Sequence, residues 1–394
     1  MAADWSTLPL DLLATIVLKL ETFEDFIYFS AVCHWWNHVS SSTKHQWRAI
    51  PMPWLLLAEN NKNNPDCVRK ILNLSNNKCY KFTLPETFGA RCWGSPYGWI
   101  AMIDRNFDVQ LFNPITKAQI HFPCLKPLDS GIAADESVQN YQSWFLGCFA
   151  NRLIVLKVPQ NDDYKFVVLV IHEYYQSLAF ARQGDQSWTP IFVKSRVKMV
   201  DIVGMEDKVF ALYENGSIVF WNVKKFNAHK LIKPKRAAYS PRDRIFVEFN
   251  RGSNQIYLVR SGSDLLVVLR YIEEVGNADD TDYDYDIVYR TIGFEVYKLN
   301  RKAKIWEEIE DLGEVALVVG GNSSMCIFVA HAKGLQRNCI YFSDDQYVFW
   351  RRVREHGGHD TGACDFKSGK IWPIYQGDDM RSSFSPPTLF IPQL

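Results

Sequence analysis

The first fifty residues of the chain carry apolar side chains at the three- and four-residue spacing of amphipathic helices. Residues 8–20 read LPLDLLATIVLKL, and one face of this stretch is apolar at Leu8, Leu12, Leu13, Ile16, Val17 and Leu20. Leu10 and Leu18, which fall off that face, are apolar as well. Because chain ends usually fray, such a helix is expected either to be buried in its own domain or to dock on a partner.

Two further short helices are expected before residue 50. Thr22 precedes Asp25 by three positions, which resembles a capping box with the shorter acid, so a second helix is expected to begin there. A third apolar segment carries Trp35, Trp36 and Val39 and then runs into SSST. Three short helices offer too little core to be stable alone, which favours a partner for the first helix.

The chain changes character after a junction at residues 51–77, where prolines and an NNKNNPD loop interrupt the pattern. Beyond it, short apolar or alternating runs lie between turn signals, as in RLIVLKV at 152–158. The stretch ALYENGSIVFW predicts a hairpin around Asn215 and Gly216. The fold class is therefore expected to be mainly β, with three helices at the start.

A rhythm recurs among these strands: an apolar strand ends in Asn or Asp, a polar turn follows, and another strand begins, as in YKLNRKAKIWEEI. The recurrences lie about 40 residues apart, which is the period of four-stranded propeller blades. Where they lie about twice as far apart, one unit of the repeat has not been recognised. The roughly 315 residues after the junction, divided by this period, predict a β-propeller of six or seven blades. A double β-sandwich is the structural alternative. Six tryptophans near strand ends are expected to pack between blades: Trp93, Trp99, Trp188, Trp221, Trp306 and Trp372.

Composition narrows the function classes. The 394 residues are 47% hydrophobic and 14% aromatic, and the net charge of +0 gives no electrostatic argument for binding nucleic acid or a membrane surface. The nine cysteines show no CxxC spacing, so we expect reduced intracellular thiols. No run approaches the roughly 20 apolar residues of a membrane span, and residues 1–5 lack the basic start of a signal peptide.

Three stretches invite a chemical interpretation, and none completes a motif. HGGHD at 356–360 groups two histidines and an aspartate, but its glycines are typical of a loop. The acidic stretch 277–286 alternates Asp like a calcium loop, yet Tyr285 and Thr291 stand where an EF-hand needs Gly and Glu. VGGNSS at 319–324 lacks the Lys-Ser/Thr ending of a phosphate loop. We therefore expect no metal, no cofactor and no catalytic residues.

The N-terminal pattern resembles an F-box, because seven positions match that motif in order: Leu8, Pro9, Leu12, Ile16, Leu20, Val32 and Trp36. The rest of the chain resembles the plant F-box class with a C-terminal kelch-like β-propeller, through landmarks such as PWLLL, GSPYGWIA, LFNPITKAQIHFP, NCIYFSDD and SPPTLFIP. The chain departs from the family at Thr388, where an aromatic residue usually follows the prolines, and in the acidic stretch 275–286.

The resemblance implies a substrate-recognition subunit of an SCF-type (Skp–cullin–F-box) ubiquitin ligase, without catalytic residues of its own. The implied domains are an F-box at 1–50, a junction at 51–77 and a propeller at 78–394. The F-box would bind a Skp-type adaptor, and through it a cullin and a RING protein, while the propeller would bind an unidentified target protein. The implied adaptor-facing residues are Leu8, Pro9, Leu12, Ile16, Leu20, Val32 and Trp36.

Two alternatives remain open at this point. A propeller can carry a carbohydrate-binding or hydrolase site, which would require convergent carboxylates or a metal in the central channel. An F-box protein can also act as a scaffold outside the ligase. The expected location is the nucleus, the cytoplasm or both, and KPKR at 233–236 would serve as a short nuclear-import signal or a solvated turn.

Overall fold

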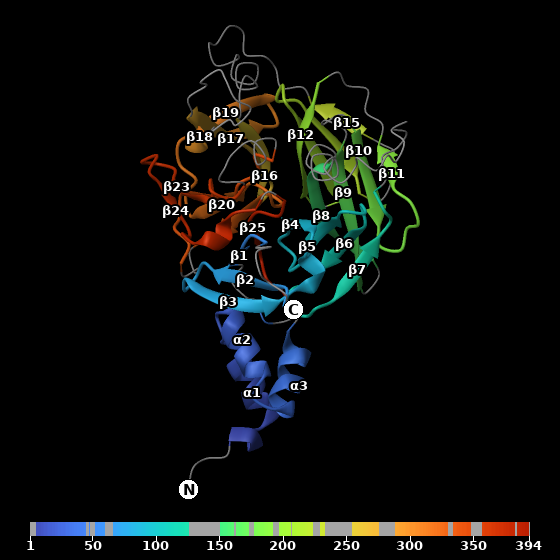
Figure 1. Ribbon diagram of the computed structural model, residues 1–394, viewed down its shortest axis with the longest axis vertical. Helices are drawn as coiled ribbons and strands as arrows, with labels where there is room; N and C mark the ends of the chain where they lie inside the picture. Colours follow the sequence, from blue (N-terminus) through green and yellow to red (C-terminus); the bar gives the residue numbers. More distant parts are fainter. Residues whose placement is uncertain are drawn as a thin grey trace.

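Three short helices project from the edge of a six-bladed β-propeller (Figure 1). The structure is a computed structural model. It describes residues 5–44, 47, 52–59, 66–125, 150–160, 163–172, 177–191, 197–205, 207–223, 229–232, 254–275, 288–329, 334–347, 357–382 and 384–393.

The helical unit, residues 5–47 as described, follows the predicted pattern closely. It contains η1 (Trp5–Thr7), α1 (Leu10–Val17), α2 (Phe23–Ser30) and α3 (His34–Thr43). The predicted cap of α2 is confirmed, since the Thr22 hydroxyl accepts a hydrogen bond of 3.1 Å from the Asp25 backbone N–H. The small core of the unit consists of Leu13, Val17, Phe26, Phe29 and Val39.

The propeller is built from six sheets, which we number as blades in chain order. The first blade contains β25 (Thr388–Phe390), β1 (Trp54–Leu56), β2 (Val68–Asn73) and β3 (Lys78–Thr83). The second contains β4 (Ala90–Gly94), β5 (Ile100–Asp104), β6 (Val109–Phe112) and β7 (Gln119–Phe122). The third contains β8 (Ala150–Gln160), β9 (Asp163–His172), β10 (Ser177–Arg182) and β11 (Thr189–Ile191).

The remaining three blades complete the ring seen in Figure 1. The fourth contains β12 (Met199–Met205), β13 (Lys208–Tyr213), β14 (Ile218–Asn222) and β15 (His229–Ile232). The fifth contains β16 (Gln255–Ser261), β17 (Asp264–Val275), β18 (Val288–Asn300) and β19 (Ile305–Ile309). The sixth contains β20 (Val315–Val319), β21 (Met325–Phe328), β22 (Cys339–Phe342), β23 (Gly362–Asp365) and β24 (Ile371–Pro373).

The ring is closed by the two ends of the propeller sequence. Strand β25, near the end of the chain, pairs antiparallel with β1, with Trp54 opposite Phe390. The first blade therefore joins strands from both ends of the chain, and its face packs on the sixth blade, so the ring leaves only the short, protected edges typical of a propeller. Strands β1 and β2 lie within residues 51–77, so this stretch, predicted as a junction, contributes two strands to the first blade.

Most blades have the predicted four antiparallel strands, and the sixth differs. It has five strands, because β20 pairs antiparallel with β21 and parallel with β22. The predicted hairpin around Asn215 and Gly216 is confirmed between β13 and β14, with Gly216 at φ +76°. That positive φ explains the glycine, since a tight hairpin turn needs a left-handed backbone there.

The apolar core lies between neighbouring blades rather than between two stacked sheets. One cluster joins the second and third blades through Trp93, Val109, Leu153 and Val168, and five others join each further pair of neighbours around the ring. The six tryptophans predicted between blades all lie in or against these clusters: Trp93, Trp99, Trp188, Trp221, Trp306 and Trp372. The alternative of a double β-sandwich is therefore wrong, and the blade number is six.

Candidate functional site

Exposed apolar side chains concentrate on the helical unit. Among the described residues, seven of the nine large hydrophobic side chains that are exposed belong to it: Trp5, Leu10, Leu12, Leu18, Tyr28, Val32 and Trp35. The other two, Ile292 and Phe328, lie on the propeller. A concentration of exposed apolar side chains on a small unit marks an interaction site more often than a single scattered apolar residue does.

The predicted adaptor-facing residues divide into two groups in the structure. Pro9, Leu12 and Val32 are exposed, with 48% of Leu12 and 56% of Val32 accessible to solvent. The other four are half-buried against the helical core: Leu8, Ile16, Leu20 and Trp36. The first group is available for contact, and the second shapes the surface on which such contact would occur.

Five exposed apolar residues of the unit were not among the predicted set: Trp5, Leu10, Leu18, Tyr28 and Trp35. The signal for two of them is present in the sequence, because Leu10 and Leu18 are apolar positions outside the face that packs inward. Trp5 comes close to α3, since the indole N–H of Trp36 donates a hydrogen bond of 3.3 Å to the Trp5 carbonyl. Nothing in the helical periodicity would have indicated that contact.

The helical unit is attached to the first blade through α2. The Glu24 carboxylate accepts hydrogen bonds from the side-chain amides of Asn73, at 2.9 Å, and Asn76, at 2.7 Å, and from the Tyr80 hydroxyl. Burial and the bond to Glu24 both raise the pKa of Tyr80, which keeps this phenol a donor at physiological pH. Phe23 packs edge-on against Trp54 at 5.8 Å between ring centroids. These contacts hold the unit at the propeller edge (Figure 1).

A buried ion pair links blades across the propeller. Arg152 on β8 donates to Asp201 on β12 at 2.6 and 3.0 Å, and also to the Gly320 carbonyl of the sixth blade. Asp201 further accepts from the backbone N–H of Leu258, at 2.7 Å. Burial alone would lower the pKa of Arg152, but Asp201 raises it, so the guanidinium stays charged. The pair therefore ties four blades together.

The acidic residues of the sixth blade are held in a second buried network. Arg270 donates to Asp360 at 2.9 Å and to Asp345 at 3.3 Å, and Tyr289 donates to Asp344 at 2.8 Å. Burial raises the pKa of Asp345, while Arg270 opposes that rise. A carboxyl with a raised pKa is a signal for catalysis only where it faces an open site. None of these three carboxylates lines the cavity described below.

The stretches that invited a chemical interpretation have structural roles where the structure describes them. In HGGHD, the His359 ring nitrogen lies 3.0 Å from the Tyr289 carbonyl, and Asp360 binds Arg270. The described residues do not include His356, the acidic stretch 277–286 or KPKR at 233–236. Within the described ranges, no three His, Cys, Asp or Glu side chains are grouped to hold a metal.

Two further findings concern the state of the cysteines and the helices that could cross a membrane. Eight cysteines of the described chain are free thiols. No helix among the described residues is both long enough and apolar enough to cross a membrane.

The structure thus consists of three short helices with exposed apolar side chains, fixed to a six-bladed propeller. Comparison with known proteins identifies this architecture as that of a plant F-box protein with a kelch-related propeller. Residues 71–367 match the KIB1-4 beta-propeller family, and the chain belongs to this family. It is similar to the F-box protein SKIP23 of Arabidopsis thaliana, with 24% identity over 98% of this chain and 95% of that protein. It is also similar to the F-box/kelch-repeat protein KIB1 of Arabidopsis thaliana, with 24% identity over 87% of this chain and 78% of that protein.

Proposed function

We propose that the protein is the substrate-recognition subunit of an SCF-type E3 ubiquitin ligase. In this proposal the helical unit docks on a Skp-type adaptor, which connects it to a cullin and a RING protein, and the propeller holds the target protein. The observation that carries the proposal is that, among the residues the structure describes, the exposed large apolar side chains gather on the helices rather than on the much larger propeller. Membership of an F-box family supports it.

The energetics are adequate for a stable complex. Burying one Leu or Val side chain contributes about 1.5–3 kcal/mol. Burial of four or five of the seven large apolar side chains exposed on the helical unit would offset the cost of association and leave a favourable remainder. Pro9, Leu12 and Val32, which are exposed in the isolated chain, are proposed as direct contacts. Leu8, Ile16, Leu20 and Trp36 are proposed to support them from the half-buried layer beneath.

The proposed role in catalysis is proximity alone. A receptor that holds a target near the charged ubiquitin-carrying enzyme raises the effective concentration of the target lysines. This requires a rigid connection between the adaptor surface and the propeller. The bonds from Asn73, Asn76 and Tyr80 to Glu24 supply such a connection at the base of α2.

The experiment is co-purification of the full chain with a plant Skp-type adaptor after co-expression. The test variant is Leu12→Ala with Val32→Ala, because both side chains are exposed and their truncation leaves no cavity in the helical core. The matched control is Ile292→Ala with Phe328→Ala, which removes two apolar side chains of similar exposure, 53% and 58%, from the propeller. We expect a stoichiometric complex with the wild type and the control, and none with the test variant.

Two results would contradict the proposal. One is a wild-type chain that folds but recovers no adaptor. The other is equal recovery with the test variant and the control, which would move the adaptor contact away from Leu12 and Val32. Addition of a cullin and a RING protein then separates a ligase subunit from a scaffold, because only the former enters the larger complex.

A further inference from the structure

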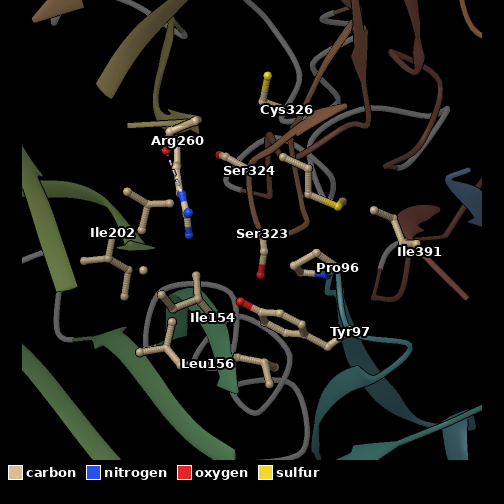
Figure 2. A pocket seen from close by; sticks show the side chains of 15 residues that line it. Pro96, Tyr97, Ile154, Leu156, Ile202, Arg260, Ser323, Ser324, Cys326 and Ile391 are labelled. Carbon is tan, nitrogen blue, oxygen red and sulfur yellow. Dashed lines mark hydrogen bonds between the residues drawn. The ribbon is translucent and has the colours of Figure 1, made fainter. Parts of the chain in front are cut away.

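A cavity of about 270 Å³ lies among the inner strands of the propeller (Figure 2). Its walls come from β8, β12 and the end of β16, from the loop after β4, and from residues 323–326. The glycine-rich segment before Ser323 crosses from the sixth blade to the second, where the Ser323 backbone N–H donates to the Gly94 carbonyl at 2.8 Å. The VGGNSS stretch at 319–324, which lacks the ending of a phosphate loop, therefore contributes Ser323 and Ser324 to the wall of this cavity.

Ser323 presents an unsatisfied polar group to the cavity. The residue is only 7% exposed, and its hydroxyl has no hydrogen-bond partner among the described residues. Figure 2 shows this hydroxyl aimed into the cavity. Buried polar groups are nearly always hydrogen-bonded, and leaving one unpaired costs about 1–3 kcal/mol. The hydroxyl therefore indicates a bound group in the functional state.

Two further donors lie around the same space. Arg260 uses its Nε to donate to the Gly262 carbonyl at 3.0 Å, which leaves the two terminal nitrogens of the guanidinium directed into the cavity (Figure 2). The Tyr97 hydroxyl points into the same space from below Ser323 in the view of Figure 2. Burial raises the pKa of Tyr97, although Arg260 opposes that rise, so the phenol remains a hydrogen-bond donor at neutral pH.

Most of the remaining lining is apolar, apart from Ser324, whose hydroxyl donates a hydrogen bond of 3.2 Å to Asp201. Ile154, Leu156 and Ile202 form one side of the cavity, opposite Ser323. Arg260 is the one cationic side chain among the lining residues that the structure describes. One planar guanidinium with two hydroxyls matches a carboxylate, which accepts paired hydrogen bonds from the guanidinium fork. The apolar wall then fits an aliphatic group attached to that carboxylate.

We propose that this cavity binds the C-terminal residue of a target polypeptide, with its free carboxylate on Arg260, Ser323 and Tyr97 and its apolar side chain against the isoleucine and leucine wall. The volume is below the roughly 300–1,000 Å³ of sites for drug-sized ligands, so it suits one residue better than a cofactor. That the ligand is a polypeptide rests on the proposed function, since a target-binding subunit must recognise some part of a protein.

The test uses the full chain in complex with its adaptor, and fluorescence anisotropy of fluorescein-labelled Gly-Ser octapeptides that end in Leu, Ile, Val, Met or Phe. Each peptide is made with a free C-terminal carboxylate and as the C-terminal amide. We expect at least one free acid to bind about tenfold or more tightly than its amide, because only the acid accepts the paired guanidinium bonds. Arg260→Gln and Ser323→Ala are expected to remove most of that difference.

The control variant is Arg337→Gln, which removes an exposed arginine on the sixth blade, paired with Glu314, and should change nothing. Equal binding of acids and amides, or no binding by any peptide, would overturn the inference. Binding of free 4-methylpentanoate without binding of the peptides would also overturn it, because the site would then take a small acid.

Two variants allow the carboxylate site and the proposed ligase function to be tested separately. Arg260→Gln is expected to keep full adaptor recovery, since Arg260 lies on the propeller. The Leu12→Ala, Val32→Ala variant, assayed without adaptor, is expected to keep peptide binding. A wild-type chain that binds the peptides but recovers no adaptor would refute the ligase assignment and leave the carboxylate site standing.

Discussion

At the scale of single residues, the position that departs from the family pattern has a clear structural role. Thr388 stands where the resemblance expects an aromatic residue, and it is almost fully buried in β25. Its hydroxyl accepts from the Gly94 backbone N–H at 3.0 Å and donates to the Gly321 carbonyl at 3.0 Å. One side chain thus joins the first, second and sixth blades.

Thr388→Val is expected to lower the free energy of unfolding by about 1–3 kcal/mol, because two buried backbone groups lose their partner while the shape is kept. Chemical denaturation followed by tryptophan fluorescence measures this. Thr189→Val, at an exposed position of β11, is the control and is expected to stay within about 0.5 kcal/mol of the wild type. A Thr388→Val variant as stable as that control would show that the two bonds contribute nothing.

Tyr213 carries a buried hydroxyl without a partner among the described residues, and burial raises its pKa from 10.0 to about 12. Between those two pH values the folded chain keeps a proton that the unfolded chain has released. The contribution of this group to stability is therefore complete below pH 10 and is lost as the pH rises through about 12.

Tyr213→Phe is expected to leave stability at neutral pH unchanged or slightly higher, since it removes an unpaired buried hydroxyl. It is also expected to flatten the loss of stability above pH 10. Denaturation curves at neutral and alkaline pH test both points. A large loss at neutral pH would mean that the hydroxyl has a partner after all.

At the scale of elements, local signals predicted most of what the structure contains. The cap at Thr22, the hairpin at Asn215 and Gly216 and the blade rhythm all depend on residues close in sequence. The parallel pairing of β20 with β22 and the closure by β25 depend on contacts between distant residues, so periodicity does not encode them. This is why the sequence alone did not decide between six and seven blades.

The proposed adaptor surface could be predicted in part, because part of its signal is also local in sequence. Leu12 and Val32 belong to a motif with local spacing, and the structure exposes both. The cavity was not predictable, because Tyr97, Arg260 and Ser323 come from three different blades. No spacing in the sequence relates such positions, and only the closed ring brings them together.

Helix α2 is the element that connects the two parts, and Glu24 is its main polar contact. Glu24→Ala is expected to leave the propeller intact while it increases hydrogen exchange in α2 and in the β2–β3 turn, because three donors lose their shared acceptor. Hydrogen exchange with mass spectrometry measures this. The control is Glu310→Ala, which changes an exposed residue directly after β19. Unchanged protection of α2 would indicate that Phe23 and its aromatic contacts hold the unit alone.

At the scale of the whole molecule, the account divides the chain into a small docking unit and a large closed ring. The six inter-blade clusters give the ring its rigidity, and the Arg152–Asp201 pair reinforces it from within. The helical unit has a core of five buried apolar residues, and within the described ranges it exposes more large apolar side chains than the ring does. A partner that covers the helices would supply the burial that the unit lacks.

The most direct test of the central claim is calorimetric titration of a purified plant Skp-type adaptor into the wild-type chain and into the Leu12→Ala, Val32→Ala variant. The account predicts tight binding to the wild type and a loss of about 100-fold or more in the variant, since two apolar anchors are truncated. The Ile292→Ala, Phe328→Ala control should bind like the wild type. Equal affinity for the test variant and the wild type would contradict the claim that the exposed apolar helices are the adaptor-docking surface.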